Sequence, residues 1–164
     1  MRKILVAVVV TASAAAMISG ASLAAASARP AVSTIEHIQG MSTSATSNKT
    51  SVIATGVFTA GGVDIATGAT TDIFKFPTGT FKVKHHERAM EEAVNSKTCL
   101  FTISGTGTYK LSDGTGSYAG ISGHGKYVLR ILAVAARNSK GKCSMKATPV
   151  AWQQVIRAQG PVKL

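Results

Sequence analysis

Residues 120–127, GISGHGKY, come close to a phosphate-binding loop, whose pattern is G-x-x-x-x-G-K-[ST]. Gly120, Gly125 and Lys126 occupy the required positions, but Tyr127 replaces the hydroxyl residue that would hold magnesium. Such a loop must also open a helix, because the amides at the helix N-terminus bind the phosphate. The run that follows, KYVLRILAV, instead favours a β-strand. We therefore predict no nucleotide site and no cofactor.

His85, His86 and Glu87 stand next to one another and raise the question of a metal site. Adjacent residues on a strand point to opposite faces, which disfavours binding of one ion by both histidines. The sequence is not H-E-x-x-H, and further ligands would have to come from distant parts of the chain. We interpret these residues as a solvated strand end and predict no metal.

His124 lies between two glycines and is the one candidate for an acid or base in a pocket. A turn histidine in contact with water is the favoured alternative. Asp64, Asp72 and Asp113 sit beside turns, where aspartate is ordinary. No Ser-His-Asp set can be placed from the order of the residues alone. The sequence therefore leans away from an enzyme.

Cys99 and Cys143 are the two cysteines of the chain. In an exported protein oxidation is the default, so we predict that they form a disulfide. Closing that loop would stabilise the fold by about 4 kcal/mol on the chain-entropy model. The alternative, a catalytic cysteine, needs a neighbouring base.

The N-terminus has the three parts of a secretory signal peptide. Arg2 and Lys3 precede the apolar run ILVAVVV, and small residues ending in LAAASARP follow. We predict cleavage after Ala28, so that residues 1–28 are the signal peptide and the protein is secreted, either extracellular or in the cell envelope. An uncleaved anchor is the alternative, but it needs about 20 strongly apolar residues, and serines, a threonine and a glycine interrupt this stretch.

The chain is basic, with a formal net charge of +11, and remains basic without the predicted signal peptide. The densest cationic group is Arg137, Lys140, Lys142 and Lys146 in a polar loop. This group would suit an anionic envelope surface, and a merely solvated loop is the alternative. Residues 137–146 contain no aromatic side chain that could stack with bases, so we predict no specific nucleic-acid binding.

The mature chain is predicted to hold one domain. Residues 41–51 are almost all small or hydroxylated and show no apolar periodicity. We therefore interpret residues 29–50 as a Ser/Thr-rich arm or linker and residues 51–164 as the domain.

Alternating apolar residues predict that the domain is built from strands. The predicted strands are 52–61, 71–76, 80–85, 97–111, 126–136 and 150–160, the last of which could instead be helical. Phe74 and Phe76 share one face of a predicted hairpin strand, and Phe81 and Val83 share one face of its partner. Residues 85–96, HHERAMEEAVNS, lack alternation and favour a helical turn across a barrel end.

Seven glycines fall within residues 105–125. Glycines inside strand patterns mark bulges, sharp bends and close approach of backbones, and a sheet that curls into a barrel needs such bends. Asp113-Gly114 is also a strong turn signal between two alternating runs. We therefore predict that these glycines let a β-sheet turn and close.

Residues 114–123, GTGSYAGISG, resemble the GTG-x-(aromatic)-x-G-x-x-G stretch of allene oxide cyclase and dirigent-type barrels, above all the small secreted bacterial members. The motif residues are Gly114, Gly116, Tyr118, Gly120 and Gly123, and their role is structural. The resemblance implies an all-β, closed antiparallel barrel of about eight strands with a central cavity, often in a homo-oligomer. Plant members steer cyclisation or radical coupling of apolar molecules, but no pocket residue of theirs aligns here.

We expect an exported barrel that binds a small apolar ligand or a surface partner without catalysis. Small Ala, Thr and Gly residues are plentiful, which favours a mostly apolar cavity over a filled barrel. The alternatives are an isomerase or cyclase of the allene oxide cyclase kind and a structural protein of the cell envelope. Converging ionisable groups in the cavity would favour the enzyme, and a barrel filled by large side chains the structural role.

Overall fold

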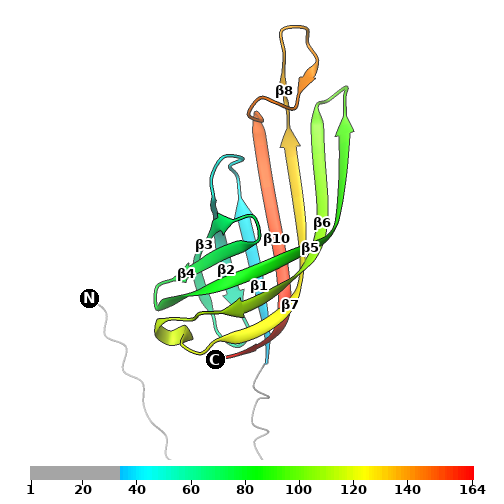
Figure 1. The fold of residues 1–164 in the computed structure, drawn as a ribbon. Helices are drawn as coiled ribbons and strands as arrows, with labels where there is room; N and C mark the ends of the chain where they lie inside the picture. The colour runs from blue at the N-terminus through cyan, green and yellow to red at the C-terminus, as the bar shows by residue number, and fades with distance from the viewer. Residues whose placement is uncertain (1–33) are drawn as a thin grey trace, which may run out of the picture. The chain divides into compact units, whose positions relative to one another are not determined.

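The computed structural model describes residues 34–164, and the predicted signal peptide with its cleavage site lies outside them. The described residues are all-β, and eight strands close into an antiparallel barrel in the order β1-β10-β7-β6-β5-β4-β3-β2 (Figure 1). The barrel strands are β1 (Ile35–Ser42), β2 (Lys49–Thr55), β3 (Ala60–Gly68), β4 (Thr71–Phe76), β5 (Gly79–Asn95), β6 (Leu100–Ser112), β7 (Ser122–Val134) and β10 (Ala151–Lys163). A short 3-10 turn, η1 (Gly116–Tyr118), and a separate hairpin of β8 (Ala136–Arg137) and β9 (Cys143–Ser144) complete the fold. The predicted barrel is confirmed.

The interpretation of residues 29–50 as an arm or linker is wrong for β1. This strand pairs with β2 on one side and β10 on the other, and so closes the barrel. Its buried positions are Glu36, Ile38 and Gly40, of which only Ile38 is a large apolar residue. The alternation of apolar residues is therefore too weak to reveal the strand, and the pairing partners determine it.

The single strand predicted at 52–61 is two strands. β2 ends at Thr55 and β3 begins at Ala60, and the two pair antiparallel. Gly56, with φ of +134°, allows the chain to turn between them. The predicted hairpin of 71–76 and 80–85 is present as β4 and the start of β5.

The helical turn predicted at 85–96 is also wrong, because these residues continue β5. They pair with β6 as far as Asn95 opposite Leu100, with a β-bulge between Glu87 and Ala89. The pairing supplies backbone hydrogen bonds that the local helix propensity cannot outweigh.

Four strands extend beyond the other four. β4 accompanies β5 only as far as Lys84, whereas β5 runs on to Asn95 together with β6, β7 and β10 (Figure 1). At the end of this extension, the Cys99–Cys143 disulfide joins the β5–β6 turn to β9, which confirms the predicted pairing.

An aromatic cluster fills one end of the barrel. It consists of Phe58, Phe74, Phe76, Phe81 and Tyr118, whose ring centroids lie 5.0–6.3 Å apart in eight pairs. Each such pair contributes about 0.5–1.5 kcal/mol beyond the burial of its area. We call this cluster the plug. The plug is the main part of the barrel core. The other end of the barrel interior is lined by different residues.

The motif glycines place Tyr118 in the plug. Gly116 starts η1 with φ of +59°, in the left-handed region, and a Cβ there would collide with the carbonyl oxygen of Thr78. The amide of Ser117 donates to the same carbonyl at 2.9 Å. η1 is therefore held against the β4–β5 turn, and its Tyr118 side chain is buried.

Candidate functional site

Next to the plug the barrel is hollow. Inward-facing side chains from all eight barrel strands enclose a cavity of about 290 Å³. Phe74, Val83 and Leu111 line it on the side of the plug, since each is buried in the core. Ser47 and Asn48, in the β1–β2 loop, are exposed and also line the cavity, which places its mouth beside them. A cavity of this size suits a small molecule.

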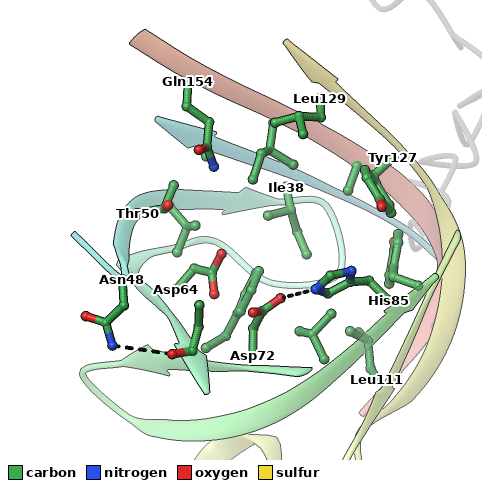
Figure 2. Close-up of a pocket in the computed structure, with 18 of the residues that line it drawn as sticks. Ile38, Asn48, Thr50, Asp64, Asp72, His85, Leu111, Tyr127, Leu129 and Gln154 are labelled. Carbon is green, nitrogen blue, oxygen red and sulfur yellow. Dashed lines mark hydrogen bonds and ion pairs between the residues drawn. The ribbon is translucent and has the colours of Figure 1, made fainter. Parts of the chain in front are cut away.

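Three ionisable side chains from neighbouring strands converge in the cavity: Asp64 on β3, Asp72 on β4 and His85 on β5. Figure 2 shows them pointing into the same space below Ile38. The Oδ2 atom of Asp72 lies 3.3 Å from Nε2 of His85. A carboxylate at this distance stabilises the protonated form of the imidazole, and a protonated imidazole stabilises the carboxylate.

Asp64 and Asp72 have perturbed acidities. Burial, and secondly the negative charge of Asp72, raise the pKa of Asp64 to about 7. Burial also raises the pKa of Asp72, and His85 opposes this rise. The side chain of Asp64 is enclosed, with 9% of the residue exposed, and its Oδ1 atom is buried without a hydrogen-bond partner. The cavity therefore contains a carboxyl group that changes charge near neutral pH and can accept a further hydrogen bond.

Two tyrosines form part of the cavity wall, and each lies against a glycine of the adjacent strand. Tyr109 on β6 is directly opposite Gly125, and Tyr127 on β7 is directly opposite Gly107. A Cβ on either glycine would collide with the opposite ring. Burial raises the pKa of Tyr109 to about 12, with a smaller effect of Glu36. These glycines therefore make room for aromatic rings in the wall.

Glu36 is buried but does not line the cavity. Its Oε2 atom accepts a hydrogen bond of 3.1 Å from the amide of Phe58 in the β2–β3 turn. Burial raises the pKa of Glu36, and the nearby backbone amides oppose this rise. Its contacts assign it to the structure of the turn beside the plug.

The sequence-predicted candidate His124 lies outside the cavity. It is exposed on β7, opposite Lys110, and is not a cavity residue. Lys126 is also exposed on an outward position of β7, and no helix follows it. The residues that resembled a phosphate loop therefore form a loop and an ordinary strand.

The basic group lies at the end of the extension, around the β8–β9 hairpin. Arg137 donates hydrogen bonds of 2.6 Å to the carbonyl oxygens of Lys97 and Gly141. Its guanidinium therefore helps to hold the hairpin to the β5–β6 turn. Lys140, Lys142 and Lys146 are exposed.

Sequence reasoning missed Asp64, Asp72 and His85 as site residues. A signal was present, because Asp72 has the same alternation phase as Phe74 and Phe76, and His85 the same phase as Phe81 and Val83. Polar residues in the phase of a buried face are inward-facing. No group of three or more His, Cys, Asp or Glu side chains within residues 34–164 could hold a metal ion.

The Cys99–Cys143 disulfide indicates an oxidising, non-cytosolic location. Within residues 34–164 there is no helix long and apolar enough to cross a membrane. No protein-family model matches the chain, and no curated protein or solved structure is significantly similar to it. The fold and the cavity themselves are therefore the basis for a functional proposal.

Proposed function

We propose that this protein is exported and that its barrel binds a small, largely apolar molecule. The observation that carries this proposal is the cavity of about 290 Å³ between the plug and the β1–β2 loop. Ile38, Leu129 and Ile156 supply apolar wall, and the exposed mouth admits a molecule from solvent. Apolar surface that leaves water contributes roughly 25 cal/mol per Å² to binding.

The resemblance of residues 114–123 to allene oxide cyclase and dirigent-type barrels supports the same proposal. A closed barrel of eight antiparallel strands with an internal cavity is the architecture which that resemblance implies, and this chain has it. The plug fills only one end of the interior, so the cavity favours ligand binding over a purely structural role.

Binding can be tested with N-phenyl-1-naphthylamine, an uncharged dye that becomes fluorescent in apolar surroundings. We expect saturable fluorescence with the folded protein, and displacement by uncharged apolar compounds such as terpenoids. The variant Leu129→Trp, which fills the cavity, should lose this binding. Its matched control is Val128→Trp, because Val128 is the adjacent residue on β7, points outward and is 55% exposed.

Ala66→Leu is a second, smaller cavity-filling variant for the case that Leu129→Trp does not fold. Circular dichroism and thermal unfolding establish whether each variant is folded. Absence of saturable dye binding to the folded parent protein would refute the proposal. Equal loss of binding in the Val128→Trp control would place the dye outside the cavity and would also refute it.

A second candidate function, an isomerase or cyclase acting on an apolar substrate, is favoured by the convergence of Asp64, Asp72 and His85. An isomerisation removes a proton from one atom of the substrate and returns one to another, so it needs no oxidant or reductant. The Asp72–His85 pair would act as the base. Asp64 would act as the acid, because a group with a pKa of about 7 is partly protonated at neutral pH.

Proton exchange on a bound ketone tests this second candidate. In D₂O, the protein should accelerate replacement of the α-protons of 4-phenyl-2-butanone by deuterium, as followed by proton NMR. Asp72→Asn and His85→Leu should abolish the acceleration, whereas the exposed control His86→Leu should retain it. Exchange no faster than without protein would argue against acid–base catalysis and leave the binding proposal intact.

The proposed export involves cleavage of residues 1–28, so the exported protein should begin at Arg29. N-terminal sequencing of protein from the medium or the envelope checks this, and an intact Met1 would contradict it. At an anionic surface, Lys140, Lys142 and Lys146 are the side chains that would make contact, because Arg137 bonds to its own chain.

A further inference from the structure

Acidic and basic side chains are separated between the inside and the outside of the barrel. The chain has 7 acidic residues, and four occupy inward-facing positions of barrel strands: Glu36, Asp64, Asp72 and Glu87. Arg88 is exposed at the β5 bulge. The other Lys and Arg residues of these strands occupy outward-facing positions: Lys49, Lys75, Lys82, Lys84, Lys110, Lys126, Arg130, Arg157 and Lys163. A basic protein therefore has an acidic interior.

Charge inside the cavity comes from a few side chains. Asp64, Asp72 and Glu87 line it, and none of the described Lys or Arg residues does. His85 is the one basic group in the wall, and it lies beside Asp72. The outward cations are in solvent, where salt screens their effect over about 8 Å at physiological ionic strength. The electrostatic preference of the cavity is therefore determined by its carboxyl groups.

Among the carboxyl groups of the cavity, Asp64 is the one with a buried atom that is free to bind a donor. It is about nine-tenths buried, it faces the cavity, and its Oδ1 atom has no hydrogen-bond partner within the described chain. An ionised carboxyl group in such surroundings is stabilised by an opposite charge or by a donor. Tyr127 and Phe74 line the same cavity, and aromatic faces attract cations.

We infer that the ligand of the cavity is a small organic cation, a protonated amine with an apolar body, whose ammonium group binds Asp64 and Asp72. The inference rests on the proposed binding function and adds the charge of the ligand. The ammonium group donates to the free Oδ1 atom of Asp64, and the apolar body contacts Ile38, Leu129 and Ile156.

The affinity of the cavity for an amine should depend on pH. Asp64 loses its proton near pH 7, and it faces Asp72 on β4 and His85 and Glu87 on β5. Tyr109 on β6 and Tyr127 on β7 also line the cavity, and burial raises the pKa of both, so they stay neutral. The cavity-lining residues of β1, β2, β7 and β10 include no other titratable side chain. The cavity therefore becomes more negative between pH 5.5 and pH 8, and affinity for an amine should rise over that range.

Three probes of similar shape but different charge separate the effect of charge on affinity from the effect of apolar contact. 2-Phenylethylamine, 2-phenylethanol and 3-phenylpropanoate share a phenyl ring on a two-carbon spacer, and are positive, neutral and negative at pH 8. Isothermal titration calorimetry at pH 5.5 and pH 8 measures their affinities for the full folded chain. We expect the amine to bind at least about tenfold more tightly than the alcohol at pH 8, and the carboxylate to bind most weakly.

Asp64→Asn keeps the shape of the side chain and removes its charge. We expect this variant to lose about tenfold or more of the affinity for the amine at pH 8, with the affinity for the alcohol unchanged. Asp72→Asn is the second variant, in case Asp64→Asn does not fold. The matched control is Glu91→Gln, because Glu91 is exposed on the extension and does not line the cavity.

The outcomes distinguish the inference from the proposed function. Alcohol binding as tight as amine binding, or amine binding unchanged in both aspartate variants, would overturn the inference and leave apolar binding in place. Tighter binding of the carboxylate would overturn it in the same way. If none of the probes and no uncharged dye binds the folded protein, the proposed function fails together with the inference.

Discussion

The side chains of Asp72 and His85 meet inside the barrel, where Oδ2 of the aspartate lies 3.3 Å from Nε2 of the histidine. The two residues come from adjacent strands, β4 and β5, and both line the cavity. Burial favours the neutral form of Asp72, whereas His85 favours its ionised form. This pair therefore controls how much negative charge the cavity carries, together with Asp64.

Replacing His85 by leucine should raise the pKa of Asp72 above its value in the parent protein. The reason is that His85 is the group that opposes the effect of burial. Carbon NMR titration of the aspartate carboxyl groups measures the change. His86→Leu is the control, because His86 is adjacent but exposed on the other face of β5. An unchanged titration of Asp72 in His85→Leu would show that the pair is not coupled.

Asp64 should make the protein less stable as the pH rises. Its folded pKa of about 7 lies above the ordinary value of 3.8, so the folded state holds a proton that the unfolded state releases between these values. Stability from this group is therefore complete below pH 4 and is lost as the pH rises to 7. Asp64→Asn should match the parent protein near pH 4 and exceed it at pH 8, by an amount on the order of a few kcal/mol at most.

Urea unfolding followed by circular dichroism at pH 4, 6 and 8 measures this difference. Glu36 also has a raised pKa, and the parent and the variant should share its pH dependence. Because the charge of Asp72 raises the pKa of Asp64, the difference between the two proteins reports Asp64 together with its interaction with Asp72. A constant difference between them from pH 4 to pH 8 would contradict the raised pKa.

Valine at Gly116 should destabilise the fold more than valine at Gly120. Both glycines have positive φ, which costs a valine about 1–3 kcal/mol. At Gly116 the added side chain would also collide with the carbonyl oxygen of Thr78, whereas at Gly120 there is open space. Thermal unfolding ranks the two variants, and equal effects would mean that contact with the β4–β5 turn is unimportant.

Lys126→Ala should change stability by no more than about 0.5 kcal/mol, because the side chain is exposed on the outer face of β7. Nucleotide titration of the parent protein and this variant completes the test. Nucleotide binding that disappears in folded Lys126→Ala would restore the phosphate-loop interpretation of residues 120–127.

Removal of the disulfide should weaken the extension. Cys143→Ser opens a loop in which the cysteines are separated by 44 residues, which on the chain-entropy model costs about 4 kcal/mol. Because the bond lies at the β5–β6 turn, faster hydrogen exchange should be concentrated in residues 86–100 and 128–137. Uniform acceleration that includes the plug would contradict this localisation.

Features that depend on local pattern and chemistry could be predicted from short stretches of the sequence. Alternation revealed the β4–β5 hairpin and the inward phase of Phe74 and Phe81, because successive side chains of a strand point to opposite faces. Two cysteines in a chain with a predicted signal peptide left one intramolecular pairing, Cys99 with Cys143, and the structure contains it. Glycine density indicated a strongly curved sheet.

Which of the weak patterns form strands depends on pairing across the whole barrel. Residues 85–96 favour a helix locally, and β1 has a single large apolar residue in its buried phase. Both are strands because partners far away in the sequence satisfy their backbone hydrogen bonds. Local propensity is worth less than a complete ladder of such bonds.

The candidate site likewise came from closure of the barrel. Asp64, Asp72 and His85 each lie near a turn in the sequence and look like ordinary solvated residues there. Pairing of β3, β4 and β5 in one register puts all three on the concave face, and closure by β1 and β10 removes that face from water. Their charge and acidity depend on this enclosure, which is a property of the whole barrel and of no single segment of the chain.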